Sequence, residues 1–292
     1  MRPLLLACAL LAGCGAVPPS APRTAASALR VATWNVHDLF DEVDRTTPPG
    51  DQDTVLSHAE VDAKLERVAR VLARADADVV VLEEVEDEPL LARLARAAPL
   101  ASRGYAAHLR DGFDPRGIDV GVLARVPVAK YVHHLDDRGP DGAHVFSRDC
   151  VEVHLDVAGR PIVLLGNHLV SRLDPAADPR RRAQAAAVRA IADALSAADP
   201  GALVLVLGDL NDLPGSAALA PLVGDGALVD LGAALPAAEA WTWSGSGERE
   251  RIDYALVPRG AAGAIAGVGV LQGEDVAAAS DHRPLVVDLW TG

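Results

Sequence analysis

Apolar residues occur along the chain in two kinds of pattern, and each pattern predicts a different element. In three stretches they recur every three or four positions, as Val61, Leu65 and Val68 do, which is typical of amphipathic helices. These helices are predicted over residues 59–74, 88–97 and 180–196. Elsewhere the apolar residues form short continuous runs, which predict buried strands. The strands are predicted over residues 29–36, 78–82, 118–124, 128–134, 150–157, 161–166, 202–207, 251–257 and 284–290.

The predicted helices and strands alternate in mixed order. This order indicates an α/β sandwich in which helices cover the faces of the sheets. The Ala- and Gly-rich stretch 260–268 predicts a loop or a poor strand. No internal repeat and no second domain is visible, so we expect one domain over residues 29–292.

The first 28 residues have the pattern of an export signal followed by a tether. Arg2 precedes an apolar run over residues 4–11 that is too short to span a bilayer. The run ends in Leu11-Ala12-Gly13-Cys14, which resembles a bacterial lipobox, although an ordinary signal peptide with a chance Cys gives the same pattern. We expect removal of residues 1–13, acylation of Cys14 and a flexible tether over residues 14–28.

Such a protein is exported and lipid-anchored to the bacterial cell envelope. The residue after Cys14 is Gly15 rather than Asp. By resemblance to Gram-negative sorting signals, this indicates the outer membrane.

Composition and charge narrow the class of protein. Half of the 292 residues are apolar but only 3% are aromatic, so the core must consist mostly of Ala, Val and Leu. The net charge of −14 argues against a protein that grips nucleic acid over a broad basic surface. It does not exclude a nuclease, because a bound divalent metal supplies local positive charge. Cys150 is expected to be a buried, inert thiol.

Polar side chains gather where the predicted strands end. Asn35 closes the first strand, and Glu83 and Glu84 close the second. The other polar segments are Asn167-His168, Asp209-Leu210-Asn211, Arg251-Ile252-Asp253-Tyr254 and Ser280-Asp281-His282. Carboxylate and amide oxygens suit a hard cation such as Mg²⁺, Mn²⁺ or Ca²⁺. Two histidines near acids suit acid/base chemistry.

Each segment alone has a plain structural explanation, such as a turn, a cap or a solvated helix start. The sequence contains no HExxH zinc motif, no P-loop and no G-x-S-x-G elbow. Zincin, nucleotide triphosphatase and serine hydrolase functions therefore have no support.

The order of these segments resembles the endonuclease/exonuclease/phosphatase superfamily. That superfamily includes deoxyribonuclease I, exonuclease III, inositol polyphosphate 5-phosphatases and neutral sphingomyelinases. The resemblance extends over residues 29–290, and segments 209–211, 251–254 and 280–282 are its most specific parts. It implies a four-layer α/β sandwich, with two mixed β-sheets packed face to face and helices outside.

The resemblance also implies a metal site. Glu84 matches the principal metal ligand, and Asn35 and Asp281 match further metal-site residues. The family more often has Gln in place of Glu83, whose extra charge would either tighten metal binding or face solvent.

The remaining site residues are carried over from the same resemblance. His282 matches the histidine that activates water or stabilises the phosphorane, and Asp253 matches the carboxylate that orients it. His168 matches the histidine that protonates the leaving oxygen in the deoxyribonuclease I branch. The other matches are Asp209 and Asn211 for positioning water and phosphate, Arg148 for phosphate contact, and Asp119 as a residue that orients His168.

Three functions are compatible with these residues. The first is a metal-dependent endonuclease acting on DNA or RNA at the cell surface or in the periplasm, which the matches of His168 and Arg148 favour. Residues 116–123 also resemble bacterial extracellular nucleases. The second is a phosphatase or sphingomyelinase-type phosphodiesterase acting on phospholipid or inositol head groups. Trp241 and Trp243 are the nearest membrane-contact candidates, although their alternation with Thr242 more simply indicates a strand near the site. The third is a non-catalytic surface lipoprotein.

For the nuclease we expect nucleic acid as substrate, a membrane contact through the lipid anchor, no organic cofactor and a monomer. A basic patch for the nucleic acid is expected near Arg103, Arg110, Arg116 and Arg148. The run 180–182 of three arginines is a second candidate, although a solvated helix start explains it equally well.

Overall fold

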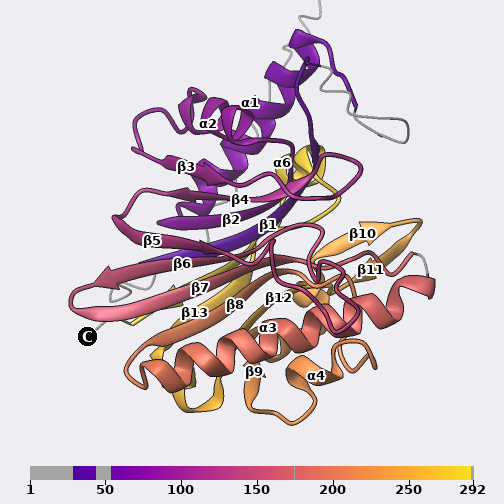
Figure 1. The fold of residues 1–292 in the computed structure, drawn as a ribbon. Coiled ribbons are helices and arrows are strands. Elements are labelled where there is room, and N and C mark those ends of the chain that lie inside the picture. Colours follow the sequence, from indigo (N-terminus) through magenta and orange to yellow (C-terminus); the bar gives the residue numbers. More distant parts are fainter. Residues whose placement is uncertain (1–28, 44–53, 174, 291–292) are drawn as a thin grey trace, which may run out of the picture.

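The computed structural model describes residues 29–43, 54–173 and 175–290, and two six-stranded mixed sheets form its centre (Figure 1). The first sheet has the order β13 (Ile265–Val270), β14 (Leu285–Leu289), β1 (Leu29–Leu39), β2 (Val79–Val85), β4 (Asp119–Ala124) and β3 (Ala106–Leu109). The second has the order β5 (Val128–His133), β6 (Cys150–Val157), β7 (Arg160–His168), β8 (Leu203–Asp209), β12 (Asp253–Pro258) and β9 (Leu228–Asp230). A separate hairpin consists of β10 (Trp243–Gly245) and β11 (Glu248–Glu250).

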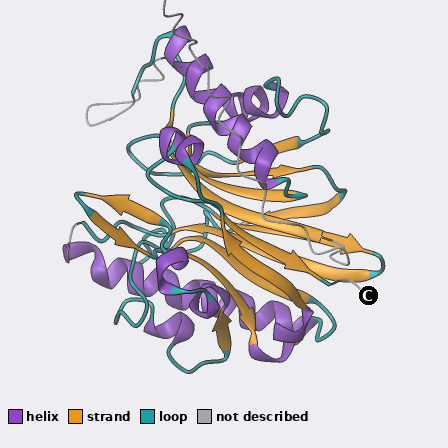
Figure 2. Ribbon diagram, turned by 180° about the vertical axis from the view of Figure 1, so that it is seen from behind, coloured by secondary structure: helices purple, strands orange, loops and turns teal. Residues whose placement is uncertain are grey.

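Helices cover the outer face of each sheet, as the view from behind shows (Figure 2). The helices are α1 (His58–Ala75), α2 (Glu88–Arg96), α3 (Asp178–Ala198), α4 (Ala220–Val223), α5 (Ala237–Ala240) and α6 (Glu274–Ala279), with 3-10 turns at Pro175–Ala177, Leu231–Ala234 and Arg259–Ala264. The predicted four-layer α/β sandwich is confirmed.

Three apolar clusters hold the layers together, and strand β2 shows how. Its residues Val80 and Leu82 face the helices, whereas Val79 and Val81 face the second sheet. Because both faces of the strand are buried, its sequence is a continuous apolar run rather than an alternating one. A third cluster lies between the second sheet and helices α3 and α4.

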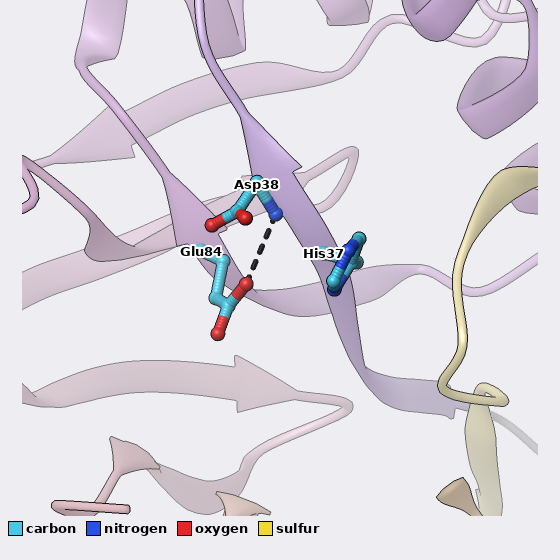
Figure 3. A group of neighbouring side chains, drawn as sticks. All are labelled: His37, Asp38 and Glu84. Carbon is cyan, nitrogen blue, oxygen red and sulfur yellow. Dashed lines mark hydrogen bonds between the residues drawn. The ribbon is translucent and has the colours of Figure 1, made fainter. Parts of the chain in front are cut away.

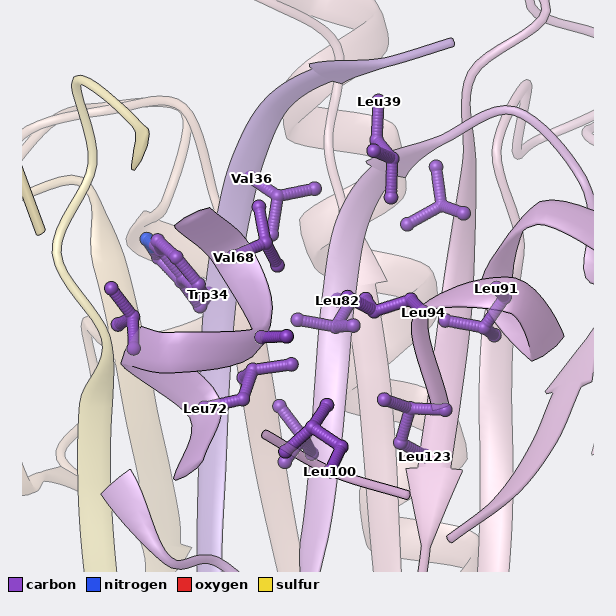
Figure 4. Close-up of a cluster of buried hydrophobic side chains, with 14 of the residues drawn as sticks. Trp34, Val36, Leu39, Val68, Leu72, Leu82, Leu91, Leu94, Leu100 and Leu123 are labelled. Atoms are coloured by element: carbon purple, nitrogen blue, oxygen red, sulfur yellow. The ribbon is translucent and has the colours of Figure 1, made fainter. Parts of the chain in front are cut away.

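Helix α1 begins where the sequence supplies a capping box. The Ser57 side chain accepts a hydrogen bond from the Glu60 backbone, and the Glu60 carboxylate accepts one from the Ser57 backbone. The buried face of the helix places Val68 and Leu72 against the side chains of β1 and β2 (Figure 4). The helix therefore packs on the strands that carry part of the candidate site.

The structure differs from the predicted elements in a few places. The stretch 260–268, expected to be a loop or poor strand, contains both a 3-10 turn and the start of β13, an edge strand paired with β14. Strands β3, β9 and β11 are short and were not predicted, whereas β10 begins at Trp243, where the alternation with Thr242 indicated a strand. Cys150 is fully buried, as predicted, and burial raises the pKa of its thiol well above the usual value, which disfavours the reactive thiolate.

Residues 1–28, including Cys14, lie outside the described residues, so the leader, the lipidation and the tether stay predictions. Within the described ranges, no helix combines the length and the apolar character needed to cross a bilayer.

Candidate active site

The polar strand ends converge on one cavity of about 610 Å³. Strands β1 and β2 run parallel, as do β7 and β8, so the carboxyl ends of each pair lie at the same sheet edge. Strand β12 begins at that edge because it is antiparallel to β8, with Asp253 opposite Asp209. The β10–β11 hairpin, seen beyond the strand ends in Figure 1, adds Trp243 and Glu250 to the cavity wall.

The backbone is irregular where it meets the cavity. His37, Asp38, Glu84 and Asn211 have φ values of 55°, 54°, 65° and 55°, in the left-handed region that non-glycine residues avoid. The pairing register of β1 with β2 shifts at the same place. Each such residue costs about 1–3 kcal/mol, and strain of this kind concentrates at functional sites.

An acidic cluster lies at the ends of β1 and β2. Ligand atoms of His37, Asp38 and Glu84 lie within 4.8 Å of one another, and the Asp38 amide donates to Glu84 Oε2 at 3.0 Å (Figure 3). Burial and the neighbouring Glu84 charge raise the pKa of Asp38. Like charges crowded in this way fit a divalent cation, which neutralises them.

Asp281 borders this cluster. Its Oδ1 lies 3.1 Å from His37 Nδ1, and its Oδ2 accepts a hydrogen bond of 2.8 Å from Trp243 Nε1. Burial opposes ionisation of Asp281, but the His37 hydrogen bond and the His282 charge outweigh it and lower the pKa to about 2. Asp281 is therefore an ionised oxygen donor beside His37 of the acidic cluster.

Asn35 links the acidic cluster to the second half of the site. Its Oδ1 accepts a hydrogen bond of 2.9 Å from the His37 amide, and its Nδ2 donates to Asp209 Oδ2 at 3.0 Å. Asn35 thus contacts both the acidic cluster and Asp209. This position is compatible with its two predicted roles, as a metal-site residue and as a substrate-binding residue.

A buried pair of His282 and Asp253 forms the second half. His282 Nδ1 lies 3.0 Å from Asp253 Oδ2, and His282 Nε2 lies 3.8 Å from Asp209 Oδ2. Burial opposes protonation of His282, but the charges of Asp253 and Asp209 outweigh it and raise the pKa to about 10. Burial and the Asp253 charge raise the pKa of Asp209 to about 7.

His168 faces both halves of the site. Its Nε2 lies 3.6 Å from Asp209 Oδ2 and 3.9 Å from Glu84 Oε1. Burial and the charge of Arg148 lower the pKa of His168 well below its usual value, which favours the neutral ring. The predicted contact with Asp119 is wrong: His168 Nδ1 has no partner among the described residues, and Asp119 lies against Gly112 instead.

Arg148 and Asn211 lie on the same wall. Arg148 is buried, and its Nε lies 2.9 Å from Asp114 Oδ2. Both side chains donate to the Leu169 carbonyl, Arg148 at 3.3 Å and Asn211 at 3.0 Å. The Asn211 backbone N–H also donates to Asp209 Oδ1 at 2.8 Å, which fixes the carboxylate beside both histidines.

Of the four arginines expected to form a basic patch, Arg116 and Arg148 line the cavity, whereas Arg103 and Arg110 do not. Arg103 binds Asp76, just before β2 and therefore at the opposite end of the sheet from the site. Arg110 binds Asp136, and neither arginine lines the cavity. The guanidinium charges of Arg103 and Arg110 are neutralised by these local ion pairs, in a chain in which acids outnumber bases.

Glu83 has neither of the two places expected for it. Its side chain is fully buried and accepts a hydrogen bond of 2.6 Å from the Thr33 hydroxyl. Burial and the Asp253 charge raise the pKa of Glu83 well above its usual value. Burial therefore favours the neutral carboxyl, which resembles the neutral Gln expected at this position more than a charged metal ligand does.

The sequence did not single out His37, Asp38 or Lys64. Lys64 donates to the carbonyls of His37 at 2.9 Å and Ala279 at 2.7 Å, and burial lowers its pKa to about 8. The sequence signal that could have identified His37 and Asp38 is their closeness to Asn35, which they follow within three residues.

Comparisons with known proteins agree with this architecture. Residues 30–226 match the model of the endonuclease/exonuclease/phosphatase family, and no curated protein matches the sequence. Truncated TDP2 from Caenorhabditis elegans is 18% identical, with a TM-score of 0.64 over 90% of this chain and 97% of that one. The mannosyl-6-phosphatase of Bacteroides thetaiotaomicron is 17% identical, with a TM-score of 0.62 over 89% and 99% of the two chains.

The catalytic domain of human Nocturnin, solved with bound sulfate, is 17% identical, with a TM-score of 0.63 over 89% and 93%. At these identities the solved structures share the fold alone. The family match covers more than half of the chain, and the family is hydrolytic. This chain therefore belongs to the endonuclease/exonuclease/phosphatase family.

Proposed function

We propose that this protein is a divalent-metal-dependent phosphodiester hydrolase that cleaves nucleic acid. The observation that carries the proposal is the convergence, on one cavity, of an acidic cluster around Glu84 and a buried pair of His282 and Asp253. Phosphodiester hydrolysis needs charge neutralisation on the phosphate and proton transfer at water and leaving group, and these two halves supply groups for each.

The acidic cluster is the metal site of this proposal. Glu84 and Asp281 would hold Mg²⁺ or Mn²⁺, with Asn35 as a further oxygen donor. When bound, the cation neutralises charge on the phosphoryl oxygens.

The proton transfers are assigned to the buried carboxylates and histidines. Asp209, with a pKa of about 7, takes a proton from the attacking water. His282, held cationic by Asp253 with a pKa of about 10, stabilises negative charge on the pentavalent phosphorus. His168 reaches the leaving oxygen as a hydrogen-bond donor.

The alternatives have less support. Trp243 donates to Asp281, and Arg283 and Arg249 lie over the ring of Trp241, so neither tryptophan is a free membrane-insertion side chain. A non-catalytic protein would bear the cost of burying Asp209 and Asp253 together without any benefit.

The proposed location is the bacterial cell envelope, with Cys14 acylated after removal of residues 1–13. Mass spectrometry of the mature N-terminus tests this: a diacylated or triacylated Cys14 supports it. A mature protein that begins at another residue contradicts it.

The deciding experiment uses the full chain with supercoiled plasmid DNA in Mg²⁺/Ca²⁺, Mn²⁺ or EDTA. Phosphate release from phosphoinositides and head-group release from sphingomyelin are measured in parallel. Nicking that depends on metal and is lost in His282→Ala supports the nuclease. Activity on the lipids alone would support the phospholipid or inositol phosphate hydrolase instead of the nuclease. Metal-independent nicking would contradict the mechanism.

A further inference from the structure

Four arginines line the cavity, and three of them face carboxylates. Arg148 pairs with Asp114 at 2.9 Å, and Arg172 forms an ion pair with Glu250 of the hairpin. Arg116 lies 3.8 Å from Glu84 Oε1 and closer still to Asp114. The charges of these three arginines are therefore partly neutralised by carboxylates of the protein.

The fourth, Arg180, is different. It lies in the first turn of α3, is exposed and lines the cavity, and within the described residues its guanidinium has no ion pair or hydrogen bond. Its neighbours in the arginine run are both engaged: Arg181 is buried against Asp212, and Arg182 donates to the Ala217 carbonyl. The run is thus not a uniformly solvated helix face, because one arginine is left to face the cavity.

An exposed apolar side chain also lines the cavity. Leu173, in the middle of the connection between β7 and α3, is 88% exposed and lines the cavity. Phe113 is the other large exposed apolar residue of the lining, at 49%. Single exposed apolar residues are common, but these two border the same cavity as an unpaired arginine.

We propose that Arg180 and Leu173 form a subsite for the nucleotide next to the cleaved bond, with the flanking phosphate on Arg180 and the sugar or base against Leu173. The inference rests on the proposed function and narrows it to substrates with more than one phosphate. Only a local cation can serve here, because the chain as a whole repels polyanions. A substrate with a single phosphate leaves this subsite empty.

Binding is the first test, because it does not require turnover. A fluorescein-labelled ten-residue oligodeoxythymidine is titrated with the full chain in EDTA at several salt concentrations, and anisotropy gives Kd. Arg180→Gln should raise Kd roughly tenfold and reduce the slope of log Kd against log salt by about 0.7, the value for one lost phosphate contact on a single strand. Leu173→Ser should raise Kd and leave the salt slope as it is.

Arg96→Gln is the matched control, since Arg96 is an exposed arginine of α2 that does not line the cavity. Its Kd and salt slope should equal those of the wild type, and circular dichroism should show the same melting for all variants. Equal Kd and slope for Arg180→Gln and wild type would overturn the subsite. So would equal weakening by Arg96→Gln, or a wild type that does not bind the oligonucleotide.

Turnover separates this inference from the proposed function. KM for the oligonucleotide in Mg²⁺ should rise in Arg180→Gln by at least fivefold more than KM for bis(p-nitrophenyl) phosphate, which has one phosphate. A wild type that binds the oligonucleotide but does not cleave it contradicts the proposed function, while the Kd values still decide the subsite. If KM rises equally for both substrates, Arg180 contacts the reacting phosphate, and the proposed flanking subsite is wrong.

Discussion

His282 Nδ1 lies 3.0 Å from Asp253 Oδ2, and this pair joins the two sheets at the floor of the cavity. Asp253 begins β12 of the second sheet, whereas His282 precedes β14 of the first. Neither residue alone determines the distance, which depends on how the sheets pack. The Trp34 indole strengthens the arrangement by donating to the His282 carbonyl at 3.1 Å from within the core of the first sheet.

Replacing Asp253 with Asn should lower kcat by about 10²–10⁴-fold, because the amide no longer stabilises the His282 cation. The pKa of His282, about 10 in the wild type, should fall towards its ordinary value. NMR titration of the His282 ring measures this. Because the folded state raises the pKa of His282, protonation of this ring stabilises the fold fully below pH 6.5, and the stabilisation is lost as pH rises through about 10. The loss of stability in Asp253→Asn should therefore be largest in acid. A variant with wild-type kcat would remove Asp253 from the mechanism.

The pH dependence of catalysis should follow the same groups. With Asp209 as base and His282 as cation, kcat/KM should rise as Asp209 loses its proton near pH 7 and fall as His282 loses its proton near pH 10. A bound cation near Asp209 should move the lower limb to more acid pH. The measurement is kcat/KM for bis(p-nitrophenyl) phosphate from pH 5 to 11 in saturating Mg²⁺. A rate that falls steadily between pH 6 and 9 would contradict these roles.

Glu84→Gln should weaken metal binding by roughly tenfold or more, because affinity for hard cations follows the number of charged oxygen ligands. Calorimetric titration with Mn²⁺ measures the change without any substrate. Glu88→Gln removes an exposed acid of α2 and is the control, with unchanged affinity expected. If both variants bind Mn²⁺ as the wild type does, the metal lies elsewhere.

His168→Ala should affect substrates according to their leaving group. Loss of a group that assists the leaving oxygen should slow cleavage of DNA by about 10²–10⁴-fold. A nitrophenolate leaves without such help, so bis(p-nitrophenyl) phosphate should lose far less. Equal losses for both substrates would show that His168 acts on the phosphate or the water instead.

The sequence predicted the long elements well, because their patterns are set by burial on one or both faces. Strand β2 reads as a continuous apolar run for this reason, and α1 shows the spacing of a helix with one buried face. The irregular end of β1 was not predictable, since His37 and Asp38 adopt left-handed φ values that residue type disfavours. Nor was the place of Glu83, which is buried beside Thr33 and whose pKa is raised by burial and by the charge of Asp253 from another strand.

Asp119 offers a test of stability away from the proposed catalytic groups. Its side chain is buried, one carboxylate oxygen has no partner among the described residues, and burial raises its pKa to about 8. The folded state therefore holds this proton more tightly than the unfolded chain, and the associated stability is lost as pH rises from about 4 through 8.

Asp119→Asn removes the charge that burial penalises. The free energy of unfolding of the variant, minus that of the wild type, should increase as pH rises. Above pH 8 this difference should be about 1–3 kcal/mol, the usual cost of an unsatisfied buried group. Denaturant unfolding at pH 5, 7 and 9 measures the difference. Glu248→Gln, at an exposed acid of β11, should show no such pH trend. A constant difference at all three pH values would mean that Asp119 keeps the same protonation state in folded and unfolded chains.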